Sequence, residues 1–247
     1  MIEQSFGIRT SDGSADASTF HPDGEGPWPA VIFYMDGIGI RPDLFSMAGR
    51  LASNGYYVLL PDLYYRAGKQ PPFDPASVFN EGSPERERLM KMFQSINNTL
   101  VMQDTAAFLD FLNRQPAAKT DGIGCVGYCM GGGFALSAAG TYPGRVKAAA
   151  SFHGASLASD RPDSPHRLAD RMRAKLFIGV AGIDPYFPPE QGQQLRAALD
   201  AAGVPYEYEV FPEVRHGFAV NGLPVYDREA SERHWERLLK LFKGALA

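Results

Sequence analysis

The stretch GIGCVGYCMGGGFALSAA, residues 122–139, decides the fold predicted for this chain. It begins with an apolar run typical of a buried strand and ends with residues that favour a helix. Between them lies the pattern G-x-C-x-G, from Gly127 to Gly131, with Cys129 at its centre. This spacing matches the nucleophile elbow, a strained strand-to-helix turn whose flanking glycines leave room for neighbouring backbone. The sequence therefore predicts that Cys129 is presented at the N-terminus of a helix.

The two cysteines of the chain, Cys125 and Cys129, invite different interpretations. A free cysteine is most often a small buried hydrophobe, and Cys125, inside the apolar run, fits that role. Cys129 fits it poorly because it lies at the turn, where the helix dipole and free N–H groups favour a thiolate and a developing oxyanion. Both lie too close together on one strand and turn to form an obvious disulfide. We interpret Cys129 as a nucleophile and expect both thiols to be free.

The string GIGCVG, residues 122–127, also matches the dinucleotide-binding fingerprint G-x-G-x-x-G. That fingerprint follows its strand and has an acidic residue about 20 positions further on. Here the string is itself the predicted strand, and the next acid after Gly127 is Asp160. Histidines and carboxylates at metal-ligand spacing are not apparent either. We therefore expect no nicotinamide, flavin or metal cofactor.

Near-continuous apolar runs alternate with helix-like segments through most of the chain. This alternation predicts an α/β domain over residues 1–247, with a mostly parallel, doubly wound sheet flanked by helices. The segment 71–102 is longer than a simple connection, and its apolar residues recur at helical spacing, so we expect a helical excursion there. The other strand-like runs are AVIFYM (30–35), YYVLLP (56–61), VKAAASF (146–152), KLFIGVAG (175–182) and YEYEVF (206–211).

Composition and charge narrow the class of protein. The formal net charge is -4, so the sequence favours no nucleic-acid partner. No apolar run approaches the roughly 20 residues needed to cross a bilayer, and the N-terminus lacks the pattern of a signal peptide. We expect a cytoplasmic protein that does not associate with membranes and that is a monomer or a small homo-oligomer.

A nucleophile at such an elbow needs a histidine base, and the usual chain order is nucleophile, acid, histidine. In a parallel sheet the functional residues lie just beyond the carboxyl ends of the strands. His216 follows the last strand-like run and precedes the last helix-like one, so it is the predicted base. His153 would precede any suitable acid, His166 lies in a polar loop, and His234 lies in an amphipathic helix.

Asp184 is the predicted orienting acid because it stands immediately beyond the apolar run KLFIGVAG. The alternative is a turn-forming role, since Pro185 follows it. The aspartates of residues 160–170 belong to a polar connection, where solvated charges are expected. Position along the chain thus predicts a triad of Cys129, Asp184 and His216.

With these residues placed, the chain resembles the dienelactone hydrolase family of α/β hydrolases. The resemblance implies the same triad, and it implies that the backbone N–H groups of Gly37 and Met130 form the oxyanion hole. The strings that carry it are LASNGYYVLLPDLYYR (51–66), VGYCMGGG (126–133), GIDPYFPP (182–189) and RHGFAV (215–220).

Two positions differ from the family pattern. Asp36 stands where the family has a glutamate that interacts with the nucleophilic thiol, so the resemblance implies a thiol-modulating role for Asp36. Val220 stands where the founding members have an arginine that helps to bind the substrate carboxylate. This difference disfavours the anionic dienelactone as substrate. Arg215, or Arg86 and Arg88, are the candidates to replace that arginine.

Together these features predict hydrolysis of a small-molecule carboxylic ester or lactone through a thioester acyl-enzyme. One alternative is a general carboxylesterase for small uncharged esters, which Val220 favours. The other is a non-hydrolytic thiol or ligand-binding protein, against which the intact acid and base argue. The residues predicted to line the substrate pocket are Tyr128, His153, Tyr186, Phe187 and Arg86.

Overall fold

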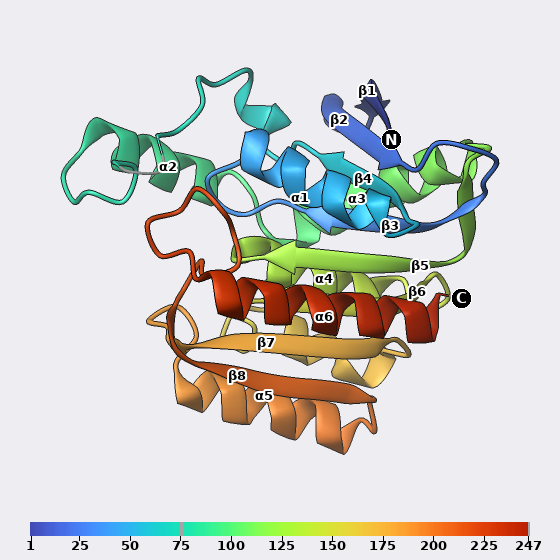
Figure 1. The fold of residues 1–247 in the computed structure, drawn as a ribbon. Coiled ribbons are helices and arrows are strands. Elements are labelled where there is room, and N and C mark those ends of the chain that lie inside the picture. Colours follow the sequence, from blue (N-terminus) through green and yellow to red (C-terminus); the bar gives the residue numbers. More distant parts are fainter. Residues whose placement is uncertain (75–76, 247) are drawn as a thin grey trace.

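The structure is a computed structural model that describes residues 1–74 and 77–246 (Figure 1). Its eight-stranded sheet has the order β1-β2-β4-β3-β5-β6-β7-β8. The strands are β1 (Ile2–Arg9), β2 (Ser14–His21), β3 (Trp28–Tyr34), β4 (Tyr57–Pro61), β5 (Ala118–Tyr128), β6 (Val146–Phe152), β7 (Lys175–Ile183) and β8 (Tyr206–Arg215). Neighbours from β4 to β8 in that order run parallel, and β2 runs antiparallel to both β1 and β4. The predicted mostly parallel, doubly wound sheet is confirmed.

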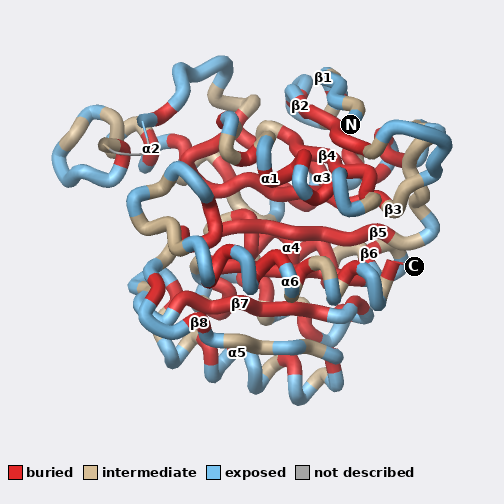
Figure 2. Tube along the Cα trace, in the orientation of Figure 1, coloured by how far each residue is buried: buried red, intermediate tan, exposed pale blue. Residues whose placement is uncertain are grey.

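Helices cover both faces of this sheet. They are α1 (Pro42–Ser53), α2 (Pro84–Gln94), α3 (Asn98–Asn113), α4 (Met130–Thr141), α5 (Pro189–Ala201) and α6 (Arg228–Ala245), with short 3₁₀ helices η1 (Tyr65–Ala67) and η2 (Pro165–Arg171). In Figure 1, α1 and α6 lie in front of the sheet and α3 and α4 lie behind it. The central strands are consequently buried on both faces (Figure 2), as their apolar runs predict. No helix within the described residues has the length and apolar character needed to cross a membrane.

The excursion over residues 71–102 contains parts of two helices rather than one. α2 ends at Gln94, and α3 begins at Asn98 after three intervening residues, the last of which, Asn97, accepts a hydrogen bond from Leu100 N–H with its side chain. That side chain caps a new helix, although the apolar spacing of the sequence continues past it. α2 lies at one side of the molecule, apart from the sheet (Figure 1), and residues 75 and 76 of the excursion lie outside the described residues.

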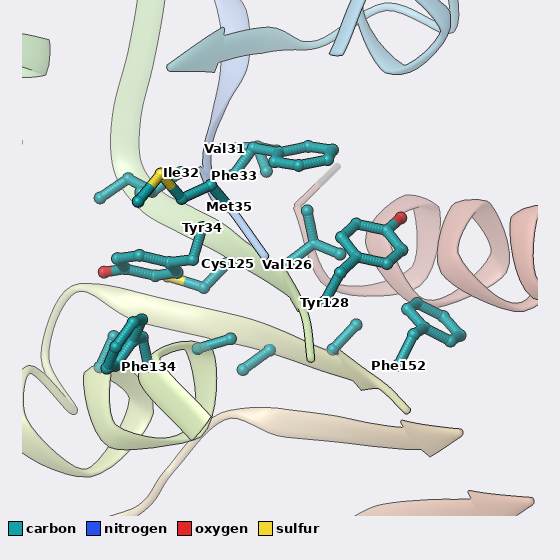
Figure 3. Packing of buried hydrophobic residues seen from close by; sticks show 14 of the residues in the cluster. Val31, Ile32, Phe33, Tyr34, Met35, Cys125, Val126, Tyr128, Phe134 and Phe152 are labelled. Carbon is teal, nitrogen blue, oxygen red and sulfur yellow. The ribbon is translucent and has the colours of Figure 1, made fainter. Parts of the chain in front are cut away.

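The core is packed around β5, whose side chains alternate between the two faces (Figure 3). Cys125 faces α4, next to Tyr34 and Phe134, whereas Val126 and Tyr128 face the opposite way. Cys125 is completely buried, and this burial raises the pKa of its thiol. The interpretation of Cys125 as a small buried hydrophobe is therefore confirmed.

The parallel strands bring several loops to one end of the sheet. β3, β5, β7 and β8 share a direction, so the segments that follow them meet at their carboxyl ends. These segments carry Gly37, Cys129, Asp184 and His216, respectively.

Candidate active site

The turn between β5 and α4 holds Cys129 in a backbone conformation that is uncommon for a residue with a side chain. Its φ is +55°, in the left-handed region. A Cβ atom on Gly127 would come within 1.8 Å of the Gly131 carbonyl oxygen, and one on Gly131 would come within 2.5 Å of the carbonyl oxygens of Tyr34 and Met35. The two glycines are needed for close backbone contact, and the predicted strained turn is present.

Hydrogen bonds to neighbouring backbone and to His153 hold the Cys129 backbone in this conformation. Its N–H donates to the Phe152 carbonyl and to Nδ1 of His153, both at 3.2 Å. Its carbonyl accepts from Ala155 N–H at 3.2 Å and from Gly132 N–H at 3.1 Å. Since Nδ1 accepts a hydrogen bond, neutral His153 carries its proton on Nε2. Burial, and then the charge of His216, keep the pKa of His153 well below its usual value.

Asp184 and His216 lie side by side because their strands are neighbours. The register of β7 and β8 pairs Ile183 with Arg215, so the residues that follow meet beyond the sheet. Nδ1 of His216 lies 2.8 Å from Oδ2 of Asp184, whose side chain is buried. Oδ1 of Asp184 accepts a hydrogen bond from Tyr186 N–H at 2.9 Å. The carboxylate is thereby oriented toward the imidazole.

Cys129, the third residue of the predicted triad, influences the pKa of His216. Burial lowers the pKa of His216, but the negative charge of Cys129 and the hydrogen bond to Asp184 outweigh it and raise the pKa to about 10. Nε2 of His216 is buried, and no well-aligned hydrogen bond to it exists within the described residues. Cys129 is therefore one of the groups that act on the His216 ring at short range.

The loop after β3 contacts two aromatic residues, Tyr64 and Phe93. Tyr64 donates its O–H to the Gly37 carbonyl at 2.9 Å and also lies 3.5 Å from Sδ of Met130. A Cβ atom on Gly37 would come within 2.2 Å of the Phe93 ring. Met130 is the first residue of α4, so its N–H has no acceptor within the helix. Two backbone segments suited to stabilising an oxyanion are thus next to Cys129.

Asp36 makes contacts different from those implied by the family resemblance. Its two carboxylate oxygens accept hydrogen bonds from Arg41, each at 2.7 Å, and Oδ1 also accepts from Ile38 N–H at 3.0 Å. Among residues 1–74 and 77–246, no hydrogen bond joins Asp36 to Cys129. The carboxylate of Asp36 is instead hydrogen-bonded to residues that follow it in the same loop.

Comparison with known proteins identifies the group to which this fold and site belong. The model of the dienelactone hydrolase family matches residues 15–246. The chain belongs to the dienelactone hydrolase family. That membership places it among carboxylic ester hydrolases with an α/β-hydrolase fold, as predicted from the sequence.

Relatives in this family cover nearly the whole chain. A Methylorubrum extorquens protein named "Putative carboxymethylenebutenolidase" is 26% identical over 246 residues, which are 98% of this chain and 81% of that protein. The "Carboxymethylenebutenolidase" of Pseudomonas putida is 23% identical over 239 residues, covering 97% and 95% of the two chains. A solved structure from Klebsiella pneumoniae, described as a "Putative Dienelactone Hydrolase", has a TM-score of 0.85, 23% identity and 98% coverage of both chains. This last likeness concerns the fold.

Among the residues predicted to line the pocket, Tyr186 lies beside His216. The Tyr186 ring is half exposed, and its centroid is 4.8 Å from that of His216. Phe187 is buried directly after it. His153 is buried beneath Cys129, where it supports the backbone rather than facing an open pocket.

Tyr128 lies in the core, contrary to the expectation that it lines the pocket. It is the last residue of β5 and faces α6, where its hydroxyl is 3.0 Å from Nε2 of His234. Alternation along a strand explains this placement, because side chains of successive residues point to opposite faces. His234 contacts the Ser231 carbonyl through Nδ1, so its Nε2 accepts the tyrosine hydrogen.

Two of the three arginines proposed to bind a substrate carboxylate, Arg86 and Arg88, make contacts elsewhere. On α2, Arg86 lies 3.5 Å from the Phe79 carbonyl oxygen, and Arg88 stacks on Phe73 with its guanidinium carbon 3.8 Å from the ring centre. Val220, at the position of the dienelactone hydrolase arginine, is completely buried. No group of three potential metal ligands is found among the described residues.

The sequence did not indicate a site role for Arg41 or Phe93. Arg41 belongs to no recognisable motif, and Phe93 fits the apolar spacing of the helix expected over residues 71–102. Tyr64 was only one of several aromatic residues that could line a pocket. Only the tertiary contacts with Asp36 and Gly37 reveal their positions.

Proposed function

We propose that this protein hydrolyses carboxylic esters or lactones through a thioester formed on Cys129, with His216 as base and Asp184 as orienting acid. The observation that carries the proposal is the environment of His216. One side of its ring is hydrogen-bonded to a buried carboxylate, and Cys129 acts electrostatically on the other side. A nucleophile, a base and an orienting acid in this relation are the requirements for acyl transfer.

In the first step, the Cys129 thiolate attacks the substrate carbonyl and forms a carbon–sulfur bond. The negative charge moves to the carbonyl oxygen, where the N–H groups of Gly37 and Met130 stabilise it. The tetrahedral intermediate then collapses, the carbon–oxygen bond to the leaving group breaks, and His216 donates its proton to the departing alkoxide. The products of this step are the alcohol and a thioester.

In the second step, water hydrolyses the thioester. Acylation removes the negative charge from the sulfur, which is one of the groups that raise the pKa of His216. The pKa of His216 therefore falls in the acyl-enzyme, and the neutral imidazole can take a proton from water. Hydroxide attacks the acyl carbon, the carbon–sulfur bond breaks, and the imidazolium–thiolate pair is restored.

Small uncharged esters and neutral lactones fit the surroundings of the site better than an anionic dienelactone. Val220 offers a buried aliphatic group where the family's founding members have an arginine. The rings of Phe93, which packs against Gly37, and Tyr186, which packs against His216, add largely apolar surface near the proposed triad. A general carboxylesterase activity is thus the second candidate, and we retain Arg86 as the group to test for carboxylate binding. The proposal also includes a cytoplasmic location and no cofactor.

Turnover measurements with an aryl acetate, a neutral lactone and dienelactone test this function. Cys129→Ala is expected to abolish turnover, whereas Cys125→Ala, a change in the buried strand, is the matched control and is expected to retain it. We expect the neutral substrates to have the higher kcat/KM. Unchanged turnover in Cys129→Ala would exclude the thioester mechanism, and a native chain inactive on all three ester types would favour the non-hydrolytic alternative.

A further inference from the structure

We propose that Arg41 is a positioning residue for the oxyanion hole: paired with Asp36, it clamps the loop after β3 so that Gly37 N–H points at the reacting carbonyl oxygen. This inference rests on the proposed function. It assigns a role to a residue outside the triad and a different role to Asp36.

The clamp is a buried, bidentate ion pair. Nη1 and Nη2 of Arg41 each lie 2.7 Å from a different oxygen of Asp36, and the two side chains are only 5% and 4% exposed. Two parallel charge-assisted hydrogen bonds fix distance and angle together. Nη1 of Arg41 also donates to the Gly39 carbonyl at 3.0 Å, so the same guanidinium holds both ends of the turn.

The hydrogen bonds of this turn determine how the Gly37 peptide groups are oriented. The Asp36 carbonyl accepts from Gly39 N–H at 3.1 Å. In a planar trans peptide the N–H points opposite to the carbonyl, so this bond sets the direction of Gly37 N–H. The next peptide group is held on both sides, with the Gly37 carbonyl bonded to Tyr64 and Ile38 N–H bonded to Asp36. Rotation of either peptide would break a hydrogen bond.

Arg41 also connects this turn to the loop that carries the base. Its Nε lies 3.4 Å from Oδ2 of Asp43. The Asp43 carboxylate lies against Gly222, where a Cβ atom would come within 2.6 Å of both oxygens. Gly222 belongs to the segment that follows His216. The guanidinium therefore contacts the oxyanion loop on one side and, through Asp43, meets the base loop on the other.

This arrangement separates two possible roles of Asp36. As a thiol modulator, Asp36 would act by its charge on Cys129. In the clamp its charge is balanced by Arg41, and its contribution to the reaction is the geometry of the turn. The two roles predict different responses to substitution, because a lost charge changes thiol ionisation whereas a loosened turn changes transition-state stabilisation.

The test compares Arg41→Met, Arg41→Lys and the double variant Asp36→Asn/Arg41→Met, using the full chain and an aryl acetate. Loss of a preorganised oxyanion donor typically lowers kcat by about 10²-fold, and we expect this for Arg41→Met with little change in KM. Arg41→Lys keeps the positive charge but cannot make the bidentate contact with Asp36, so its kcat should lie between those of Arg41→Met and the native chain. The double variant leaves no unpaired buried charge and should regain thermal stability without regaining kcat.

Two further measurements distinguish positioning from a purely structural role. The pH dependence of Cys129 alkylation should be the same in Asp36→Asn/Arg41→Met as in the native chain, because that variant removes two charges that balance each other. Affinity for a trifluoromethyl ketone, which forms an oxyanion on the thiol, should fall in parallel with kcat. A folded double variant with native kcat would overturn the proposal, and so would a shifted alkylation profile in that variant. Failure of the proposed function itself gives a different result, namely turnover that survives Cys129→Ala.

Discussion

Nδ1 of His153 accepts a hydrogen bond from the backbone N–H of Cys129, at a distance of 3.2 Å. The Phe152 carbonyl shares the same N–H, so His153→Phe should weaken the support without removing it. One neutral hydrogen bond is worth about 1 kcal/mol, which corresponds to an approximately fivefold loss of kcat. Steady-state kinetics measures the loss, and His166→Asn, on η2, is the control with native kcat expected. Native kcat in His153→Phe would contradict a supporting role.

The high pKa of His216 should depend on the sulfur of Cys129. Burial alone would lower the pKa, and the charge of Cys129 is the largest influence that raises it to about 10. Cys129→Ala should therefore bring the pKa of His216 down, with Asp184 still opposing the effect of burial. Titration of the imidazole by NMR measures the change, and Cys125→Ala should leave the value unaltered. A pKa that stays near 10 without the thiol would show that Asp184 alone maintains it.

Phe93 should prevent any side chain from occupying position 37. In Gly37→Ala the new methyl group would meet the Phe93 ring at 2.2 Å, so the loop or the ring must move. We expect kcat to fall about tenfold or more, which corresponds to about 1.4 kcal/mol in the barrier. Gly37→Ala/Phe93→Ala makes room for the methyl group and should recover part of the rate. If the second substitution brings no recovery, contact with Phe93 is not the cause of the loss.

Buried His234 should make the fold sensitive to acid. Burial lowers the pKa of His234 to about 3, below the usual 6.5. Between these pH values the unfolded chain binds the proton more readily than the folded chain. The free energy of unfolding should therefore decrease as the pH is lowered, and His234 should contribute up to about 1.4 kcal/mol per pH unit to this decrease. Replacing both hydrogen-bond partners, in Tyr128→Phe/His234→Leu, should flatten that dependence. Urea unfolding from pH 7 to pH 4 measures it, and an equally steep dependence in the double variant would contradict the assignment.

The sequence was most informative where structure depends on local pattern. The central strands are apolar on both faces, so their runs stand out, and the glycines around Cys129 mark the turn directly. The hairpin of β1 and β2 was not predicted because β1, at an exposed edge, has neither a continuous apolar run nor a strict alternation of polar and apolar residues. The break before α3 was missed because one capping residue, Asn97, overrides an apolar spacing that continues through it.

In the candidate site, too, the sequence predicts residues placed by chain order but not contacts that depend on tertiary packing. Cys129, Asp184 and His216 each follow a strand, so chain order alone predicts that they meet. The contacts of Arg41 with Asp36, of Phe93 with Gly37 and of Tyr128 with His234 depend on how loops and helices pack. Nothing in the spacing of these residues indicates which partners they have. The family resemblance even suggests a different neighbour for Asp36, because it does not include the arginine five positions later.

The strand order of the sheet also bears on how the chain acquires its reactivity during folding. Cys129 follows β5 and His216 follows β8, and β6 and β7 lie between these strands in the sheet. In the proposed triad, His216 can therefore approach Cys129 only after these four strands have assembled in register. The proposal thus predicts that Cys129 reacts slowly with electrophiles until that point. The rate at which Cys129 is alkylated during refolding would thus report when strands β5 to β8 have assembled. A folding intermediate that lacks this part of the sheet would be alkylated slowly.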